Sequence, residues 1–292
     1  MSLFLQTLIS GLSLGSIYAL IALGYTMVYG IAKMLNFAHG DVIMIGAYSV
    51  IVSVMQLKLP PVAAIFIAVL FCAILGVIIE FLAYKPLRKA SPLSVLITAI
   101  GVSYFLQNIA LLIFGSARKP FPEIIDLPQI KLGNIEISGI SILTLAVTTV
   151  IMIALTLFIN CTKIGKAMRA VSEDKEAAEL MGISTNLTIS VTFAIGSALA
   201  AVASIFYGAS YTYIEPDTGS MPGIKAFTAA VFGGIGSIPG AMLGGILLGV
   251  IEQFSKAYIS PTWSDAIVFG VLILVLVVKP TGLLGKKVSE KV

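Results

Sequence analysis

The residues able to do chemistry are few and poorly spaced for catalysis. The single histidine, His39, has only Asp41 as a nearby acid, and no serine or cysteine stands in a triad-like pattern with them. A metal site needs clustered ligands, which one histidine cannot supply, and the two cysteines, Cys72 and Cys161, have no metal-ligand spacing. We therefore expect no catalytic residue, no cofactor and no metal site in this chain.

Chemistry that would supply energy is missing from the sequence as well. An ATPase needs a phosphate-binding loop such as GxxxxGK[ST], and the nearest candidate, residues 282–287, lacks the spacing and the hydroxyl residue. The most interior acid, Glu252, has Lys256 four residues later, and we expect a helix-surface pair near the membrane edge. A proton relay through Glu252 is the alternative. The chain thus requires an outside source of energy for any work it does.

The composition indicates a membrane protein. Of 292 residues, 58% are hydrophobic and only 11% are charged, and the mean hydropathy is +1.05. Soluble domains carry about 25% charged residues, so the class that fits is a polytopic membrane protein. The net charge of +4 is not a nucleic-acid signal, because the basic residues lie mainly in short loops between apolar runs. We expect an all-α bundle of membrane helices, with lipid but no nucleic acid as a partner.

Long apolar runs divide the sequence into membrane spans. A span needs about 20 apolar residues, and by that measure the chain has about eight spans plus one short or re-entrant segment, in a single membrane domain. Many of these runs are rich in glycine, alanine and serine, which lets helices approach closely. The spans are expected at 3–29, 42–57, 61–84, 93–114, 139–160, 187–208, 239–258 and 264–278, with the short segment at 223–236, all within the domain 1–292.

Charges in the loops assign the two sides of the membrane. Basic residues in the loop 84–92, in the loop 161–186 and in the C-terminal tail favour the cytoplasm, where positive loops remain. The loop 115–138 lies outside by alternation, and the loop 209–222 carries acids without a base, which suits the outside. One alternation of spans satisfies all of these cues.

The cytoplasmic loop 161–186 contains the one sizeable stretch that is neither apolar nor loop-like. Ser172 is a good N-cap and Gly182 a good residue to close a helix, so we expect a helix of about ten residues between them. On it, Ala177 lies close enough in register to Leu180 and Met181 to share part of a face. A short capped helix between two spans is suited to binding another protein; an ordinary solvated loop helix is the alternative.

Two breaks interrupt the apolar pattern, one near 36–41 and one near 233–240. Unpaired backbone groups at such breaks are tolerable in a membrane only against protein or a water-lined path. We expect these breaks to line a translocation path or to act as hinges; simple packing glycines are the alternative. The residues concerned are Asn36, His39, Gly40, Gly233, Gly234, Gly236, Pro239 and Gly240.

Several longer motifs run nearly from end to end of the sequence. They are GSIYALIALGYTMVYG at 15–30, NFAHG at 36–40, YKPLR at 84–88, GKAMRA at 165–170, MPGIKAFTAA at 221–230, GGIGSIPG at 233–240 and KPTGLLG at 279–285. Each alone would be weak, but together they are specific. With them the chain resembles the LivH-type permeases, membrane subunits of the ABC importers for branched-chain amino acids.

The resemblance implies partners and an energy source. A second, related permease of the LivM type would complete the pore, two cytoplasmic ATPase subunits would drive it, and a periplasmic binding protein would deliver the amino acid to the outer loops. In such importers a cytoplasmic loop with the pattern Glu-Ala-Ala, three residues, Gly docks into the ATPase. In this sequence the pattern consists of Glu176, Ala177, Ala178 and Gly182.

The resemblance also implies import of leucine, isoleucine or valine by alternating access, as a multi-pass protein of the cell (inner) membrane. Relatives of this type also serve urea or short amides, and nothing in this sequence selects between these cargoes. Two further alternatives come from other classes. The interrupted helices also suit a secondary carrier or channel driven by an ion gradient, and a membrane scaffold without a solute path would carry the same spans.

Overall fold

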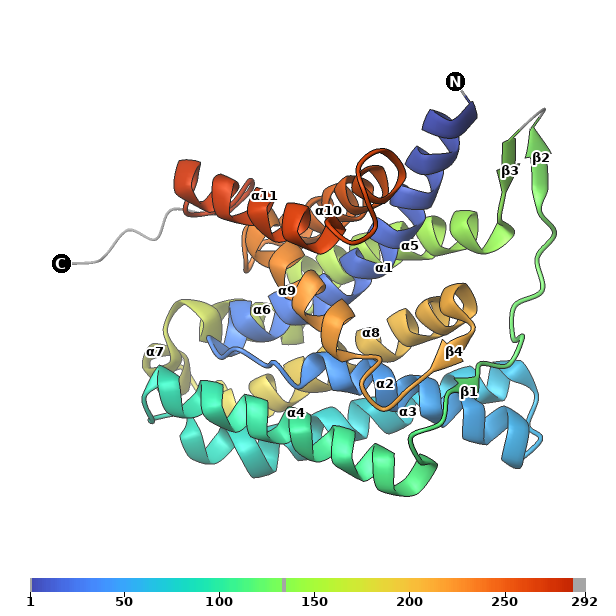
Figure 1. Cartoon of the computed structure of the whole chain (residues 1–292). Coiled ribbons are helices and arrows are strands. Elements are labelled where there is room, and N and C mark those ends of the chain that lie inside the picture. Colours follow the sequence, from blue (N-terminus) through green and yellow to red (C-terminus); the bar gives the residue numbers. More distant parts are fainter. Residues whose placement is uncertain (1, 133–134, 286–292) are drawn as a thin grey trace. The chain divides into compact units, whose positions relative to one another are not determined.

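The computed structural model describes residues 2–132 and 135–285, and most of them are helical (Figure 1). The helices are α1 (Ser2–Ala32), α2 (His39–Ile51), α3 (Pro61–Ile79), α4 (Pro92–Phe114), α5 (Gly139–Cys161), α6 (Lys163–Glu173), α7 (Lys175–Leu180), α8 (Thr185–Tyr211), α9 (Ser220–Gly233), α10 (Ile238–Tyr258) and α11 (Ser264–Val278). Short π-helical turns prolong α2 over Val52–Gln56 and α3 over Glu80–Tyr84, and a 3-10 turn follows over Lys85–Leu87. The strands are β1 (Lys119–Pro120), β2 (Ile130–Leu132), β3 (Ile135–Ile137) and β4 (Tyr213–Ile214).

The prediction of an all-α membrane bundle is confirmed. Among the described residues, seven helices are long and apolar enough to cross a membrane, and α11 is a shorter apolar helix. These eight helices coincide with the eight predicted spans to within a few residues. The predicted short segment is α9, a helix of 14 residues. A bilayer core needs about 20 helical residues, so α9 alone is too short to cross it.

Hydroxyl side chains fix where several helices begin. Ser91 starts α4, Thr162 starts α6, Ser184 starts α8 and Ser237 starts α10. Each side-chain oxygen accepts a hydrogen bond from a backbone N–H in the first turn, which would otherwise lack a partner. The spans therefore begin where the sequence places a capping residue directly before an apolar run.

The chain folds into two compact units. One comprises Met1–Thr26, Leu127–Met152 and Lys225–Val292, and the other comprises Met27–Asp126 and Ile153–Ile224. Three of the four boundaries fall within α1, α5 and α9, and the fourth falls in the loop between β1 and β2, so each unit is assembled from distant parts of the sequence. The expectation of one membrane domain over 1–292 stays a prediction.

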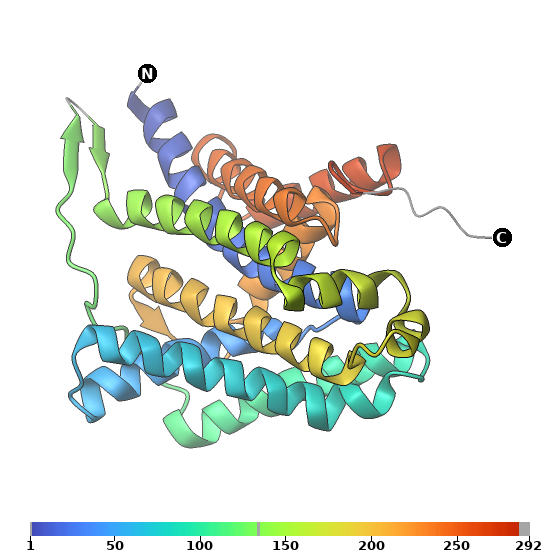
Figure 2. The ribbon, with the colours of Figure 1, turned by 180° about the vertical axis from the view of Figure 1, so that it is seen from behind.

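In the unit that contains α2, α3 and α8, glycines allow close helix packing. Gly46 of α2 lies against Ser204 and Ala201 of α8, where an added Cβ would be 2.7 Å from the serine oxygen. Gly76 of α3 lies against Ser197 of α8, and there an added Cβ would be 2.7 Å from the serine Cβ. Figure 2 shows the resulting arrangement, with α3 and α8 running side by side. The absence of side chains at these two positions sets the spacing of the helices.

In the unit that contains α1 and α10, two pairs of glycines spaced by four residues face each other. An added Cβ on Gly11 would lie 2.8 Å from the Cα of Val250, and one on Gly15 would lie 2.7 Å from the Cα of Ile246. Added Cβ atoms on Gly245 and Gly249 would overlap the backbone of α1. Small residues at this spacing let two membrane helices touch backbone to backbone.

We predict that Gly249→Val destabilises the protein by about 1–3 kcal/mol, because the new side chain would force α1 and α10 apart. Unfolding of the purified protein in detergent or nanodiscs measures the loss. Gly270→Val is the matched control, since Gly270 lies in α11 of the same unit and an added Cβ there meets nothing within 4 Å. Equal stability of the two variants would contradict the packing argument.

Candidate functional site: a short helix pair and two helix breaks

The loop 161–186 contains two short helices, α6 and α7, whereas one helix was predicted, between Ser172 and Gly182; only α7 lies within those bounds. Ser172 lies inside α6 and donates a hydrogen bond to the carbonyl of Arg169 at 2.7 Å, so the prediction that it is the N-cap is wrong. The cap is Asp174, whose extended backbone separates the helices and whose carboxylate accepts from the N–H groups of Glu176 and Ala177 at 2.9 and 3.0 Å. Serine and aspartate are equally good caps, so spacing alone did not distinguish them.

The end of α7 is closed as the sequence predicts. Gly182 has a φ of +81°, the left-handed conformation that favours glycine. Its N–H donates to the carbonyl of Glu179 at 2.9 Å, and the N–H of Ile183 donates to the carbonyl of Ala178 at 3.0 Å. This pair of bonds is the Schellman motif, and it turns the chain sharply toward α8.

The predicted coupling residues divide between two faces of this loop. Ala178 is buried, with 4% of its surface exposed, whereas Glu176 and Ala177 are exposed. Leu180 and Met181, directly before the turn, are exposed to 89% and 82%. Two large apolar side chains so fully exposed on a charged helix leave apolar surface for another protein to bury.

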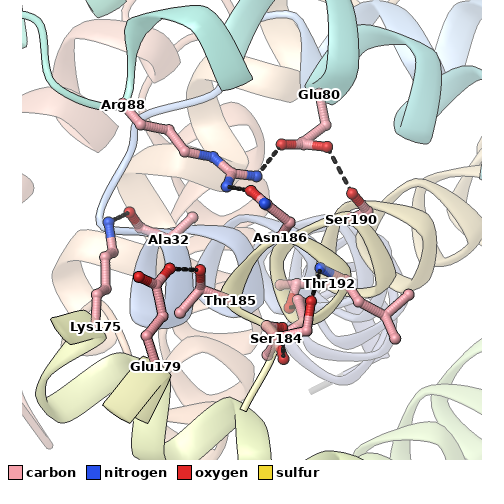
Figure 3. A network of polar contacts seen from close by, with 12 residues as sticks. Ala32, Glu80, Arg88, Lys175, Glu179, Ser184, Thr185, Asn186, Ser190 and Thr192 are labelled. Carbon is pink, nitrogen blue, oxygen red and sulfur yellow. Dashed lines mark hydrogen bonds and ion pairs between the residues drawn. The ribbon is translucent and has the colours of Figure 1, made fainter. Parts of the chain in front are cut away.

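Polar side chains tie α7 to neighbouring elements (Figure 3). The ammonium group of Lys175 donates to the carbonyl of Ala32, at the end of α1, at 3.0 Å. The hydroxyl of Thr185, the first residue of α8, donates to the carboxylate of Glu179. The short helix is therefore anchored at its two ends to two different membrane helices.

A second group of contacts lies next to these anchors (Figure 3). The carboxylate of Glu80 is fully buried, pairs with Arg88, and accepts a hydrogen bond from Ser190 of α8 at 2.7 Å. Arg88 also donates to Asn186 of α8. A buried carboxylate is tolerable when it is paired and hydrogen-bonded in this way. The end of α3 and the following basic loop are thereby joined to the start of α8.

The surroundings of Lys175 disfavour its positive charge. Burial lowers the pKa of its ammonium group, and the nearby charges of Arg88 and Lys33 lower that pKa further. The charged form is therefore less favoured here than in water. The hydrogen bond from Lys175 to the carbonyl of Ala32, an acceptor at a helix C-terminus, offsets part of this cost.

The two predicted outer loops meet each other. Strands β1 and β4 pair antiparallel, with Lys119 opposite Ile214. Arg118 forms an exposed ion pair with Glu215 at 2.7 Å, and the N–H of Phe121 donates to the carbonyl of Thr212 at 2.7 Å. The first part of the loop 115–138 and the loop 209–222 thus lie side by side within one unit, as two loops on the same side of a membrane would.

The first predicted break, near 36–41, is an irregular segment between α1 and α2. Asn36 is buried and accepts a hydrogen bond from the hydroxyl of Tyr84 at 2.9 Å. His39 is fully buried at the start of α2. Gly40 packs against the backbone of Gly219 and Gly223. An added Cβ on Gly40 would lie 2.5 Å from the carbonyl oxygen of Gly219 and 3.0 Å from the Cα of Gly223. The break therefore places the N-terminus of α2 directly against the N-terminus of α9.

Sequence reasoning missed the side chains at this junction. Asp41 is buried, with 1% of its surface exposed, and the amide nitrogen of Gln107 in α4 donates to it at 2.9 Å. The same nitrogen donates to Ser220, the first residue of α9, at 3.0 Å. These three residues are far apart in the sequence, and no motif joins them. The one feature of the sequence that could have marked them as a site is their polarity within apolar segments.

The second predicted break, near 233–240, is a tight turn between α9 and α10. Gly234 and Gly236 have φ of +107° and +91°, and the backbones of Gly233 and Gly240 touch. The free carbonyl of Gly233 accepts a hydrogen bond from the N–H of Leu284 at 2.8 Å. Pro239 lies in the first turn of α10. The glycines here serve backbone geometry, whereas their role in a path or hinge stays a prediction.

Glu252 differs from its expected place at a helix surface. Only 1% of it is exposed, and its carboxylate accepts from Lys225 at 2.8 Å, from Lys256 at 2.6 Å and from the hydroxyl of Tyr18 at 2.9 Å. Lys225 also pairs with Asp265 at 2.7 Å. The expected contact with Lys256 is present, but the surface-pair interpretation is wrong, because α1 and α9 cover the carboxylate and supply two more partners.

Comparisons with known proteins found a matching family and several relatives. Residues 7–276 match the model of a family described as the branched-chain amino acid transport system permease component. The chain is 46% identical to the permease protein BraD of a high-affinity branched-chain amino acid transport system in Pseudomonas aeruginosa, over 99% of this chain and 98% of the relative. It is 48% identical to the corresponding LivH of Escherichia coli K12, with the same coverage. A probable LivH of Methanocaldococcus jannaschii is 28% identical over 92% of this chain and 89% of its own length.

We predict that Lys225→Met destabilises the protein by about 1.5–3 kcal/mol, because Glu252 loses one buried charge-assisted hydrogen bond but keeps Lys256 and Tyr18 as partners. Adding Glu252→Gln to it should recover part of that loss. Thermal or denaturant unfolding in nanodiscs measures both variants. Arg118→Met is the control, because its exposed ion pair with Glu215 should contribute no more than about 1 kcal/mol. A loss no larger than that of the control would contradict the buried-pair assignment.

Proposed function

The chain belongs to the family of permease components of branched-chain amino acid transport systems, and we propose that it lines half of the membrane path of an ATP-driven importer for leucine, isoleucine and valine. A second, related permease of the LivM type would supply the other half. Two cytoplasmic ATPase subunits and a periplasmic binding protein would complete the complex in the cell (inner) membrane. The chain itself would be no enzyme, because ATP hydrolysis would reside in the partners.

The observation that carries this proposal is the exposed apolar end of α7. Leu180 and Met181 leave apolar surface uncovered beside the turn at Gly182, on a helix that carries the Glu-Ala-Ala pattern. A groove on an ATPase subunit that covers these two side chains would bury apolar surface worth about 25 cal/mol per Å². Ala178 would support the helix from the protein side, while Glu176 and Ala177 would lie in the docking face.

Movement of α7 would reach the membrane helices through its two anchors. The hydrogen bond from Lys175 to Ala32 connects α7 to the end of α1, only a few residues before the break at 36–41. The bond from Thr185 to Glu179 connects it to α8. A pull on α7 by closing ATPase subunits would therefore act on the break and on α8 together. The glycine contacts of α8 with α2 and α3 would let these helices slide with little interlocking.

The break residues are proposed as hinge or path-lining elements of an alternating-access cycle. The contact between Gly40 and Gly219 joins the starts of α2 and α9. The turn between Gly233 and Gly240 joins α9 to α10. Both ends of the short helix α9 thus rest on close glycine contacts, which a rotation of α9 would have to rearrange. The binding protein would dock on the paired outer loops around β1 and β4.

One alternative deserves its own test, because buried acids also suit an ion-gradient-driven carrier. Asp41 and Glu252 are the buried acids that favour it. Two lysines and a tyrosine hold Glu252, which makes it a poor proton carrier, since a retained proton would break these contacts. Leucine uptake by vesicles that contain this chain without ATPase subunits, driven by a proton or sodium gradient, would select the carrier.

We predict that Leu180→Asp with Met181→Asp abolishes ATP-driven leucine uptake by the reconstituted complex, because the charges cannot be buried in a docking groove. Copurification of the ATPase subunits should fall in parallel. Leu187→Asp is the control, because Leu187 is also exposed but lies one turn into α8. Full uptake by the double variant, or ATP-independent uptake by the original complex, would refute the proposed coupling.

We further predict that Gly182→Val reduces coupling, whereas Gly182→Asn retains most of it. The left-handed backbone costs a β-branched residue about 1–2 kcal/mol, while asparagine adopts it more readily. An added Cβ at Gly182 meets nothing within 4 Å, so the effect comes from the backbone conformation alone. The measurement is the number of leucine molecules transported per ATP hydrolysed; equal ratios for both variants would show that the turn has no role in coupling.

A further inference from the structure

Three oxygen atoms surround the amide nitrogen of Gln107. Its Nε2 lies 2.9 Å from Oδ1 of Asp41, 3.3 Å from Oγ of Ser103 and 3.0 Å from Oγ of Ser220. These oxygens come from α2, α4 and α9. A nitrogen atom is therefore held where three helices converge, at the break between α1 and α2.

The amide does not satisfy these oxygens fully. A glutamine amide nitrogen carries two hydrogen atoms, so it can serve only two of the three oxygens at one time. A primary ammonium group carries three hydrogen atoms and a positive charge. It would match all three oxygens, and its bond to the carboxylate would be charge-assisted.

The charge of Asp41 also lacks a counter-ion. Asp41 takes part in none of the ion pairs found among the described side chains. The side chains that donate hydrogen bonds to it, Gln107 and Ser103, are neutral. A carboxylate buried in a membrane span is costly without a cation, and acids in this position usually belong to a transport path.

The side chains around Asp41 are less buried than Asp41 itself. Asp41 itself is 1% exposed, but Gln107, Ser103 and Ser220 are each only partly buried. The Gln107 side chain belongs to α4 and bridges the starts of α2 and α9. Rotation of this one side chain would remove the amide nitrogen from all three oxygens.

We propose that the α-ammonium group of the transported amino acid replaces the amide nitrogen of Gln107 and binds Asp41, Ser103 and Ser220. This inference rests on the proposed function, because the cargo must carry an ammonium group. Asp41 supplies the opposite charge, and Gln107 occupies its place when no cargo is bound. Neutral urea and amides lack the charge that this site requires, so the site favours amino acids over them.

The test uses the complete importer in proteoliposomes, with binding protein saturated with leucine so that added probes act on the permease. The probes, added on the side opposite the binding protein, are isopentylamine, which is leucine without its carboxylate, and 4-methylpentanoate, which is leucine without its ammonium group. We expect isopentylamine to inhibit leucine uptake more strongly. Asp41→Asn should weaken that inhibition roughly tenfold or more, the loss of one charge-assisted hydrogen bond.

Gln107→Ala should have the opposite effect. It removes the competing amide while Asp41 and Ser220 remain, so isopentylamine should inhibit at a roughly two- to tenfold lower concentration. This variant keeps the test decisive if Asp41→Asn fails to assemble. Asn108→Ala, which alters an exposed amide on the same helix, should leave the inhibition unchanged.

Three results would overturn the inference. They are equal inhibition by the two probes, undiminished inhibition by isopentylamine in Asp41→Asn, and weaker inhibition in Gln107→Ala. Failure of the unmodified complex to import leucine with ATP would instead refute the proposed function, so the two failures are distinguishable.

Discussion

Backbone polar groups have no water to bond to within a membrane, and this constraint governs the places where a membrane-embedded segment stops being helical. The end of α9 meets it by offering its carbonyls to Leu283 and Leu284, which come from the C-terminal segment. At this break the irregular backbone therefore finds its partners in another part of the chain. The break is also one of the places where a role in transport is proposed.

Buried charges in this chain need partners as well. Glu80 is buried beside Arg88 and accepts a hydrogen bond from Ser190 of α8, while Arg88 donates to Asn186 of α8. Glu252 is buried with two lysines and Tyr18. Both carboxylates are thus neutralised within their own unit, which suits a structural role. Asp41 is the contrast, since its contacts are neutral and one of them is shared among three oxygens. That difference in pairing separates the acid assigned to cargo binding from those that hold the helices together.

Small residues at the helix contacts would let the helices move in the proposed cycle while they stay packed. Gly46 and Gly76 bring α2 and α3 against α8, and the start of α8 is in turn bonded to α7 through Thr185. A contact between smooth helix surfaces slides at less cost than one between interlocked long side chains. One end of α8 is bonded to α7 through Thr185, and its other end leads into the paired strands β1 and β4. In the proposed cycle, α8 would therefore connect α7 with the outer loops.

Length, polarity and local capping are properties of sequence, and they determined much of this protein. The spans followed from apolar run lengths, Gly182 from its place after a short helix, and the family from motifs spread along the chain. Other features depend on which helices become neighbours. Asp174 rather than Ser172 is the N-cap of α7, because the backbone is extended at Asp174. Glu252 is buried because α1 and α9 cover it. Asp41, Gln107 and Ser220 meet only after three helices have packed, since no local rule relates residues so distant in sequence.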